Sequence, residues 1–117
     1  MTTIRHLLLA PEFQHLQLIA GKDGLNRKLS GINVIESDDL IQFCRANELI
    51  VTTGIQMKNN TQMLERLVKR SFDKKVAGVI INVGPYIPEV PPSIIEFADN
   101  NHFPLIQMEW KYRVADL

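Results

Sequence analysis

The chain has 117 residues, of which 45% are hydrophobic and 22% are charged, a balance typical of one globular domain with one core. Basic and acidic residues both number 13, so the net charge is zero, which argues against a domain that binds nucleic acid by itself. The single cysteine, Cys44, excludes an intrachain disulfide, and the absence of a long apolar run argues against a membrane span or a signal peptide.

The N-terminal third predicts one short helix and two strands. Thr3 can cap a helix that ends near Pro11, because the residue before a proline disfavours helical geometry. Residues 16–20 and 32–36 are mostly apolar and predict strands, with Asn33 and Glu36 as polar interruptions of the second. Between them, residues 21–24 have the composition of a turn.

A second short helix is predicted directly after residue 36. Ser37 is placed to cap it, and Asp38 and Asp39 fall in its first turn, where the helix dipole favours negative charge. We expect its buried side to consist of Leu40, Ile41 and Phe43.

Residues 48–54, Glu-Leu-Ile-Val-Thr-Thr-Gly, are the most informative segment. Three apolar residues without polar alternation predict a strand that is buried on both faces. Gly54 then ends the strand, because glycine permits turns that a side chain hinders. Ligands of open parallel sheets bind beyond the carboxyl ends of strands, and Thr52, Thr53 and Gly54 are predicted to lie at such an end.

From residue 49 to residue 108 the predicted order is strand, helix, strand, helix, strand. This alternation favours right-handed crossovers and a parallel sheet. The first helix of this alternation has apolar residues at helical spacing, namely Met63, Leu64, Leu67, Val68 and Phe72. We therefore predict an α/β fold, a mostly parallel β-sheet flanked by helices in a single compact domain.

The ends of these helices also carry recognisable signals. Asn59 and Gln62 are predicted to form the entry of the first helix, and Ser93 and Glu96 have the spacing of a capping box after Pro91 and Pro92. Asn100 and Asn101 predict a left-handed exit from the second helix. Strands at 79–83 and 104–108 complete the pattern.

No strong catalytic or cofactor motif is present. The chain has neither a phosphate-binding loop nor a G-x-G-x-x-G segment, and His6, His15 and His102 share no metal-ligand spacing, so we predict no cofactor and no metal site. Cys44 is expected to be a small buried apolar residue.

Several polar or aromatic residues near the predicted strand ends have two readings. Thr52 and Thr53 either bind a small ligand or satisfy backbone groups where the strand ends. Glu36 is either a ligand-binding carboxylate or, as we favour, a structural one. Asn82 either faces the same edge or ties one loop to another as a buried amide. Trp110 either lines that edge or anchors a partner domain.

Taken in order, these segments resemble the N-terminal domain of the PucR-type purine catabolism regulators. The resemblance extends over nearly the whole chain, and its most specific piece is the segment 48–54. The other matching pieces are residues 3–8, 34–36 and 77–79, Pro92, Ala98 and residues 104–106.

The resemblance implies a bacterial transcription regulator of the cytoplasm and not an enzyme. Residues 1–110 would form a regulatory domain, and residues 111–117 would begin a linker or helix toward middle and helix-turn-helix regions of the same full-length chain. This domain itself would contact neither nucleic acid nor membrane, and we expect it to form a homo-oligomer.

The resemblance also implies a signal-sensing role with a small metabolite as ligand, and the family name suggests a purine-pathway compound. Glu36, Thr52, Thr53 and Gly54 match the family's motif positions, and with Asn82 they are the candidate ligand-binding residues. Residues 82–86 depart from the family, which has more glycine in this loop.

Two alternatives stay open. The domain either senses a ligand or serves as a dimerisation or interdomain-docking module, for which we expect four exposed residues to be used, namely Tyr86, Ile87, Trp110 and Tyr112. A small hydrolase that uses Thr52 or Thr53 is the least favoured, because no base stands at a recognisable spacing from either hydroxyl.

Overall fold

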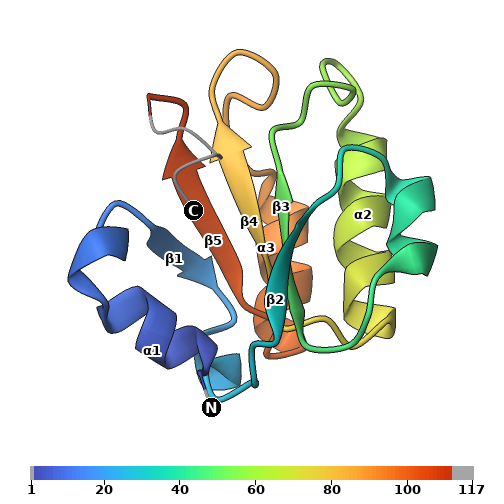
Figure 1. Ribbon diagram of the computed structural model, residues 1–117. Helices are drawn as coiled ribbons and strands as arrows, with labels where there is room; N and C mark the ends of the chain where they lie inside the picture. The colour runs from blue at the N-terminus through green and yellow to red at the C-terminus, as the bar shows by residue number, and fades with distance from the viewer. Residues whose placement is uncertain (1, 112–117) are drawn as a thin grey trace.

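Five strands form one sheet in the computed structural model, which describes residues 2–111 (Figure 1). Their order across the sheet is β1-β5-β4-β3-β2. Four strands are parallel, namely β2 (Gly31–Val34), β3 (Glu48–Thr52), β4 (Gly78–Val83) and β5 (Leu105–Glu109). The edge strand β1 (Gln17–Ala20) runs antiparallel to β5. The predicted α/β fold with a mostly parallel sheet is confirmed.

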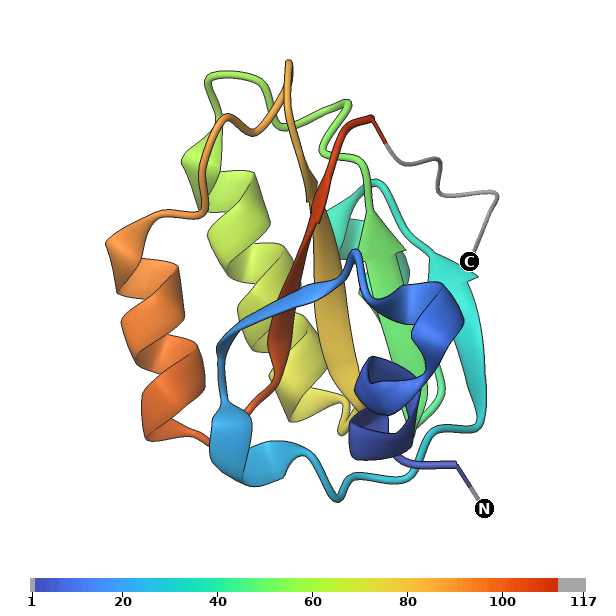
Figure 2. The ribbon, with the colours of Figure 1, turned by 90° about the vertical axis from the view of Figure 1, so that its left-hand side faces the viewer.

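Helices cover both faces of this sheet. Figure 2 shows α2 (Thr61–Asp73) and α3 (Pro92–Asn100) on one face and α1 (Ile4–Leu9) on the other. Each face has its own core, which buries side chains that alternate along the central strands. The central strand β3 is buried over four successive residues, as its unbroken apolar run predicts.

The strand β2 forms an open edge of the sheet. Ile32 and Val34 pair in register with Leu49 and Val51, so all four side chains lie on the α1 face. Leu49 and Val51 have no exposed surface, whereas Ile32 is 41% and Val34 is 49% exposed. The layer that contains α1 therefore leaves β2 uncovered.

Helix α2 has the predicted apolar face, but its cap is one residue later than predicted. The Asn60 side chain, and not that of Asn59, accepts from the backbone N–H of Met63 at 3.2 Å. Asn59 instead takes a left-handed φ of 58°, which asparagine tolerates, and so turns the chain into the helix. On the exposed side of the helix, Lys69 Nζ pairs with the Glu65 carboxylate one turn earlier at 2.8 Å.

Replacing Asn60 with alanine is expected to lower the free energy of unfolding by about 1 kcal/mol, because the Met63 N–H in the first turn loses its side-chain acceptor. Urea unfolding followed by circular dichroism measures this change. Asn60→Ser keeps a capping oxygen and serves as the control, since serine caps helices about as well as asparagine. Equal stability of both variants and the native chain would contradict the assigned cap.

Two predictions for α3 are wrong. The helix begins at Pro92, so Ser93 lies inside its first turn, and the cap residue Pro91 makes no side-chain hydrogen bond. At the other end the left-handed residue is His102, with a φ of 52°, and not Asn100 or Asn101. The Asn101 side chain instead donates to the Phe97 carbonyl at 2.8 Å, which holds Asn101 on the helix end.

The predicted helix after Ser37 is a 3₁₀ helix, η3 (Asp38–Phe43), and Ser37 makes no side-chain cap. Residues three apart eclipse one another in a 3₁₀ helix, so Asp38 and Ile41 share the buried side. Leu40 and Phe43 share the outer side and are 46% and 74% exposed, so their predicted burial is wrong.

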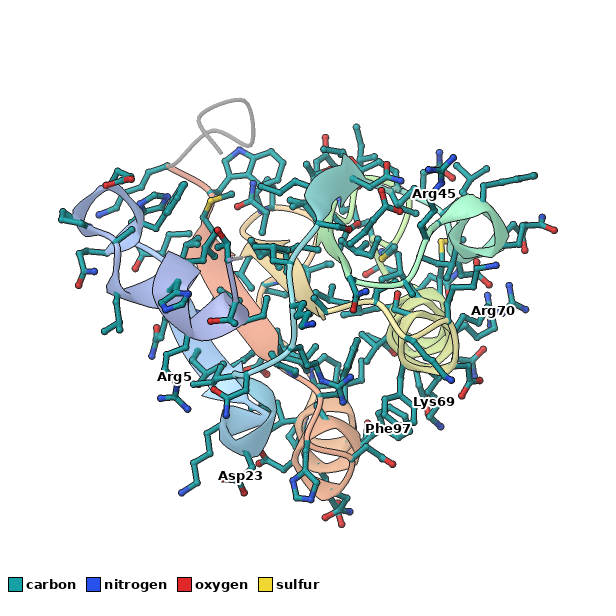
Figure 3. All side chains as sticks on the ribbon, turned by 60° about the horizontal axis from the view of Figure 1, so that its bottom comes forward. Arg5, Asp23, Arg45, Lys69, Arg70 and Phe97 are labelled. Carbon is teal, nitrogen blue, oxygen red and sulfur yellow. The ribbon has the colours of Figure 1, made fainter. Side chains whose placement is uncertain are left out.

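Ion pairs hold η3 to α2. The nearly buried carboxylate of Asp38 lies 3.0 Å from Arg66 Nε and 2.8 Å from Arg70 Nη1. Arg70 also pairs with Asp39 at 3.2 Å. Figure 3 shows Arg70 on the outer side of α2, and Lys69 and Phe97 between α2 and α3.

Candidate functional site

The carboxyl ends of β2 and β3 are joined by a compact hydrogen-bonded group, which we call the Glu36 cluster and which consists of Glu36, Thr52, Thr53 and Gly54. Oε1 of Glu36 accepts from Thr52 Oγ1 at 2.9 Å and from the Thr53 backbone N–H at 2.8 Å. Oε2 accepts from the Thr53 hydroxyl. The Gly54 N–H donates to Thr52 Oγ1 at 3.2 Å. Four predicted site residues are thus brought together.

The Glu36 cluster uses its polar atoms internally. Thr52 has no exposed surface, and its hydroxyl both donates to Glu36 and accepts from Gly54. A buried hydroxyl in this state supports the structural reading of Thr52, since it closes the backbone where the strand ends. Thr53 is half-buried, and its hydroxyl faces the same carboxylate.

The pairing of Thr53 with Glu36 is relevant to the hydrolase alternative, because the sequence showed no base at a recognisable spacing from either threonine hydroxyl. Glu36 supplies a carboxylate within hydrogen-bonding reach of both hydroxyls. The same carboxylate also holds the Thr53 backbone N–H, so a shift of Glu36 toward a substrate would leave that N–H without its acceptor.

The side chain of Asn82 lies on the opposite face of the sheet. Thr52 pairs with Ile81, whose side chain belongs to the core beneath α2 and α3, and Asn82 follows Ile81 in β4. With its amide oriented so that its donors meet acceptors, Asn82 Nδ2 donates to the carbonyls of Met108 at 2.9 Å and Glu109 at 3.3 Å. Asn82 therefore ties β4 to β5 and is separated from the Glu36 cluster.

Gly54 connects the Glu36 cluster to the loop between β4 and α3. Its φ of +75° is in the left-handed region, and the space that a Cβ would need is filled by the end of the Ile87 side chain. Ile87 is only 4% exposed, so its predicted role as an exposed docking residue is wrong.

A cavity of about 380 Å³ lies beside this contact, at the carboxyl ends of β3 and β4. The cavity lies between the β3–α2 loop and the β4–α3 loop. Figure 1 shows both loops above the sheet. The β3–α2 side and α2 contribute Met57, Lys58, Asn59, Thr61 and Leu64. The β4–α3 side contributes Pro85, Tyr86, Ile87, Pro88, Glu89, Pro91 and Pro92.

Sequence reasoning missed this cavity, although a signal was present. Residues 84–92 are rich in proline and apolar residues yet lie between a strand and a helix. Loops are usually polar, so an apolar loop that proline stiffens indicates a surface against which something packs.

Two further hollows have similar volumes but a different character. One of about 440 Å³ lies between η3 and α2, and one of about 460 Å³ lies beside β1 and α3. Charged side chains that already have partners contribute to both, as Arg70 does in the first and Asp99 in the second. The cavity at the strand ends combines an apolar wall with the location at which open α/β sheets bind ligands.

Cys44 is buried, as predicted. Burial raises the pKa of its thiol, and the Glu48 carboxylate raises it further against a smaller opposing effect of Lys74. A thiol in this state is a poor nucleophile at neutral pH. Among residues 2–111, no three side chains of histidine, cysteine, aspartate or glutamate are grouped so as to hold a metal ion. None of the helices described is long and apolar enough to cross a bilayer.

Trp110 follows β5 and is 40% exposed. Its ring packs edge-to-face on Tyr86, with the ring centroids 5.5 Å apart and the planes at 73°. Tyr86 is one of the residues that line the cavity, so Trp110 adjoins the candidate site through Tyr86. Tyr112, the remaining predicted docking residue, lies outside the described residues.

Two comparisons with known proteins show the family of the chain. Residues 6–117 match the model of the purine catabolism regulatory protein-like family. The chain is 32% identical over 114 residues to the purine catabolism regulatory protein of Bacillus subtilis (strain 168). That alignment covers 97% of this chain but only 22% of the relative's length. The chain therefore belongs to the purine catabolism regulatory protein-like family.

Proposed function

We propose that this chain is the metabolite-sensing domain of a cytoplasmic transcription regulator. The cavity at the strand ends carries the proposal, because it has the size and the location of a small-ligand site. The regulator family supports it, since a regulatory domain needs a signal. DNA binding would belong to other regions of a longer chain, beyond a regulatory domain that ends near residue 110.

We further propose a purine-pathway compound as the ligand. The name of the Bacillus relative suggests this chemistry, and the cavity suits it. The Tyr86 ring and neighbouring prolines offer flat surfaces on which a heterocycle can stack, and Ile87 adds to the apolar wall. Lys58 and Glu89 place charges of both signs at the rim, where polar edges of such a ring find hydrogen-bonding partners.

The expected result is thermal stabilisation of the chain by urate or allantoin. A ligand that binds only the folded state adds about 2.7 kcal/mol at a free concentration of about 100 times Kd. Differential scanning fluorimetry detects a gain of this size. If neither compound stabilises the protein at millimolar concentration, the purine assignment fails.

A matched pair of variants tests the location. Thr61 lines the cavity and Gln62 does not, and both are exposed in the first turn of α2. Thr61→Phe is expected to fill the cavity and to abolish the stabilisation, whereas Gln62→Phe leaves it unchanged. Equal responses of both variants would move the binding site elsewhere.

The second candidate is a dimerisation module that needs no ligand. It is favoured by the open edge of β2 with the exposed Ile32 and Val34, because a symmetry-related β2 would pair with this edge and cover both side chains. Sedimentation velocity distinguishes it. A monomer at every concentration excludes it, and a dimer that Val34→Lys dissociates supports it.

A further inference from the structure

The loop between β4 and α3 joins the cavity to the point at which the chain leaves the sheet. Tyr86 lines the cavity and also packs its ring against Trp110, directly after β5. Any molecule that occupies the cavity can therefore contact a side chain that also determines the surroundings of Trp110.

Two further contacts define the position of Trp110. Val83 pairs with Glu109 at the end of the sheet, so Gly84 and Trp110 lie side by side. A Cβ on Gly84 would come within 2.5 Å of the Trp110 Cβ and 2.9 Å of its Cγ. The indole thus lies directly on the Gly84 backbone and has no space to move in that direction.

Ile87 and Tyr86 are neighbours in this loop, but their side chains differ in how freely they can move. Ile87 is 4% exposed and fills the space above Gly54, so it is fixed. Tyr86 is half-buried and Trp110 is 40% exposed, so their rings can reorient without opening the core. The Gly84 N–H donates to the Ile87 carbonyl at 2.8 Å, and this bond holds the base of the loop while Tyr86 lies at its tip.

We propose that Tyr86 is the positioning residue that couples occupancy of the cavity to the orientation of Trp110, and thereby to the segment that follows β5. The inference rests on the proposed ligand site. A ligand that stacks on the cavity side of the Tyr86 ring changes which ring orientation is favoured, and Trp110 loses or gains its edge-to-face contact accordingly. The orientation of the Trp110 ring then differs between the free and the occupied protein.

Because Trp110 is the single tryptophan, its indole N–H gives one unambiguous resonance in a ¹H–¹⁵N spectrum. We would titrate the labelled chain with allantoin and with urate. The backbone amides of Lys58 and Asn59 report binding in the cavity, and the indole reports the coupling. The expected result is that both respond with the same affinity.

Two variants isolate the role of Tyr86. In Tyr86→Leu the amides of Lys58 and Asn59 are expected to respond still, with the indole response lost. Tyr86→Phe keeps the ring and is expected to restore the indole response. Amides that respond while the native indole does not would overturn the coupling and leave the ligand site standing.

If neither compound binds, the purine assignment fails. The coupling between the cavity and Trp110 can then still be tested without a ligand. Met57→Ala alters the cavity wall, and Met63→Ala makes the same change on α2 away from the cavity. We expect Met57→Ala to shift the indole resonance more than Met63→Ala does, and this excess shift to disappear in the Tyr86→Leu background. Equal shifts, or an excess that survives without Tyr86, would overturn the coupling.

Discussion

Replacement of Glu36 by alanine is expected to lower the free energy of unfolding by about 3 kcal/mol. The carboxylate accepts from Thr52 Oγ1, from the Thr53 backbone N–H and from the Thr53 hydroxyl. Thr52 has no exposed surface in the native chain, so the substitution takes the acceptor from a buried hydroxyl. A buried donor that loses its partner costs the full desolvation of that group, and an ionised acceptor makes the lost bonds stronger than average.

Urea unfolding of Glu36→Ala, Glu36→Gln and the native chain measures this effect. Glutamine keeps one acceptor oxygen near Thr52 and Thr53, so its loss is expected to be less than half as large. A stability loss below about 0.5 kcal/mol in the alanine variant, the range of an ordinary surface substitution, would show that the Glu36 cluster contributes nothing to folding.

Gly21→Ala is expected to cost about 3 kcal/mol, because strain in the left-handed region adds to a backbone clash. Gly21 has a φ of +75°, and a Cβ there would collide with the Phe103 carbonyl and come within 2.6 Å of Pro104 N. Its N–H also donates to Asp99 Oδ1 at 2.8 Å, which fixes the turn against the end of α3. The surrounding atoms are backbone and cannot rotate away.

Gly31→Ala provides the matched control. No heavy atom lies within 4 Å of the position that its Cβ would occupy, so its stability is expected to stay within about 0.5 kcal/mol of the native chain. Thermal unfolding of the two variants side by side separates conformational strain from any general effect of a glycine-to-alanine change. Similar melting temperatures would contradict the close packing of the turn at Gly21.

The central strands β3 and β4 are readable from the sequence because they are buried on both faces. Residues 49–51 and 79–81 are unbroken apolar runs, and α2 between them has a clear helical period. The η3 segment is not readable in this way. Its 3₁₀ geometry rotates Leu40 and Phe43 outward. The burial of Asp38 depends on Arg66 and Arg70, which belong to a helix that is distant in the sequence.

The candidate site shows the same limit. Strand ends place Glu36, Thr52 and Thr53 near one edge, and that proximity follows from a parallel sheet. Which face Asn82 occupies depends on the register of β4 against β3, and sequence alone does not define that register. The cavity depends on two loops meeting, one through Met57 and the other through Tyr86 and Ile87, and loop approach leaves no periodic pattern.

The pairing of β1 with β5 has a consequence for the order of folding. Gln17 and Leu18 lie opposite Gln107 and Ile106, so the first strand completes its ladder with the last one. Contacts between such distant segments form late, because a long loop must close before they are gained. During synthesis β1 would wait for β5, and a nascent chain that stops before Leu105 lacks the strand with which both β1 and β4 pair. The ladder between β1 and β5 therefore forms only once the chain from Gln17 to Glu109 is present.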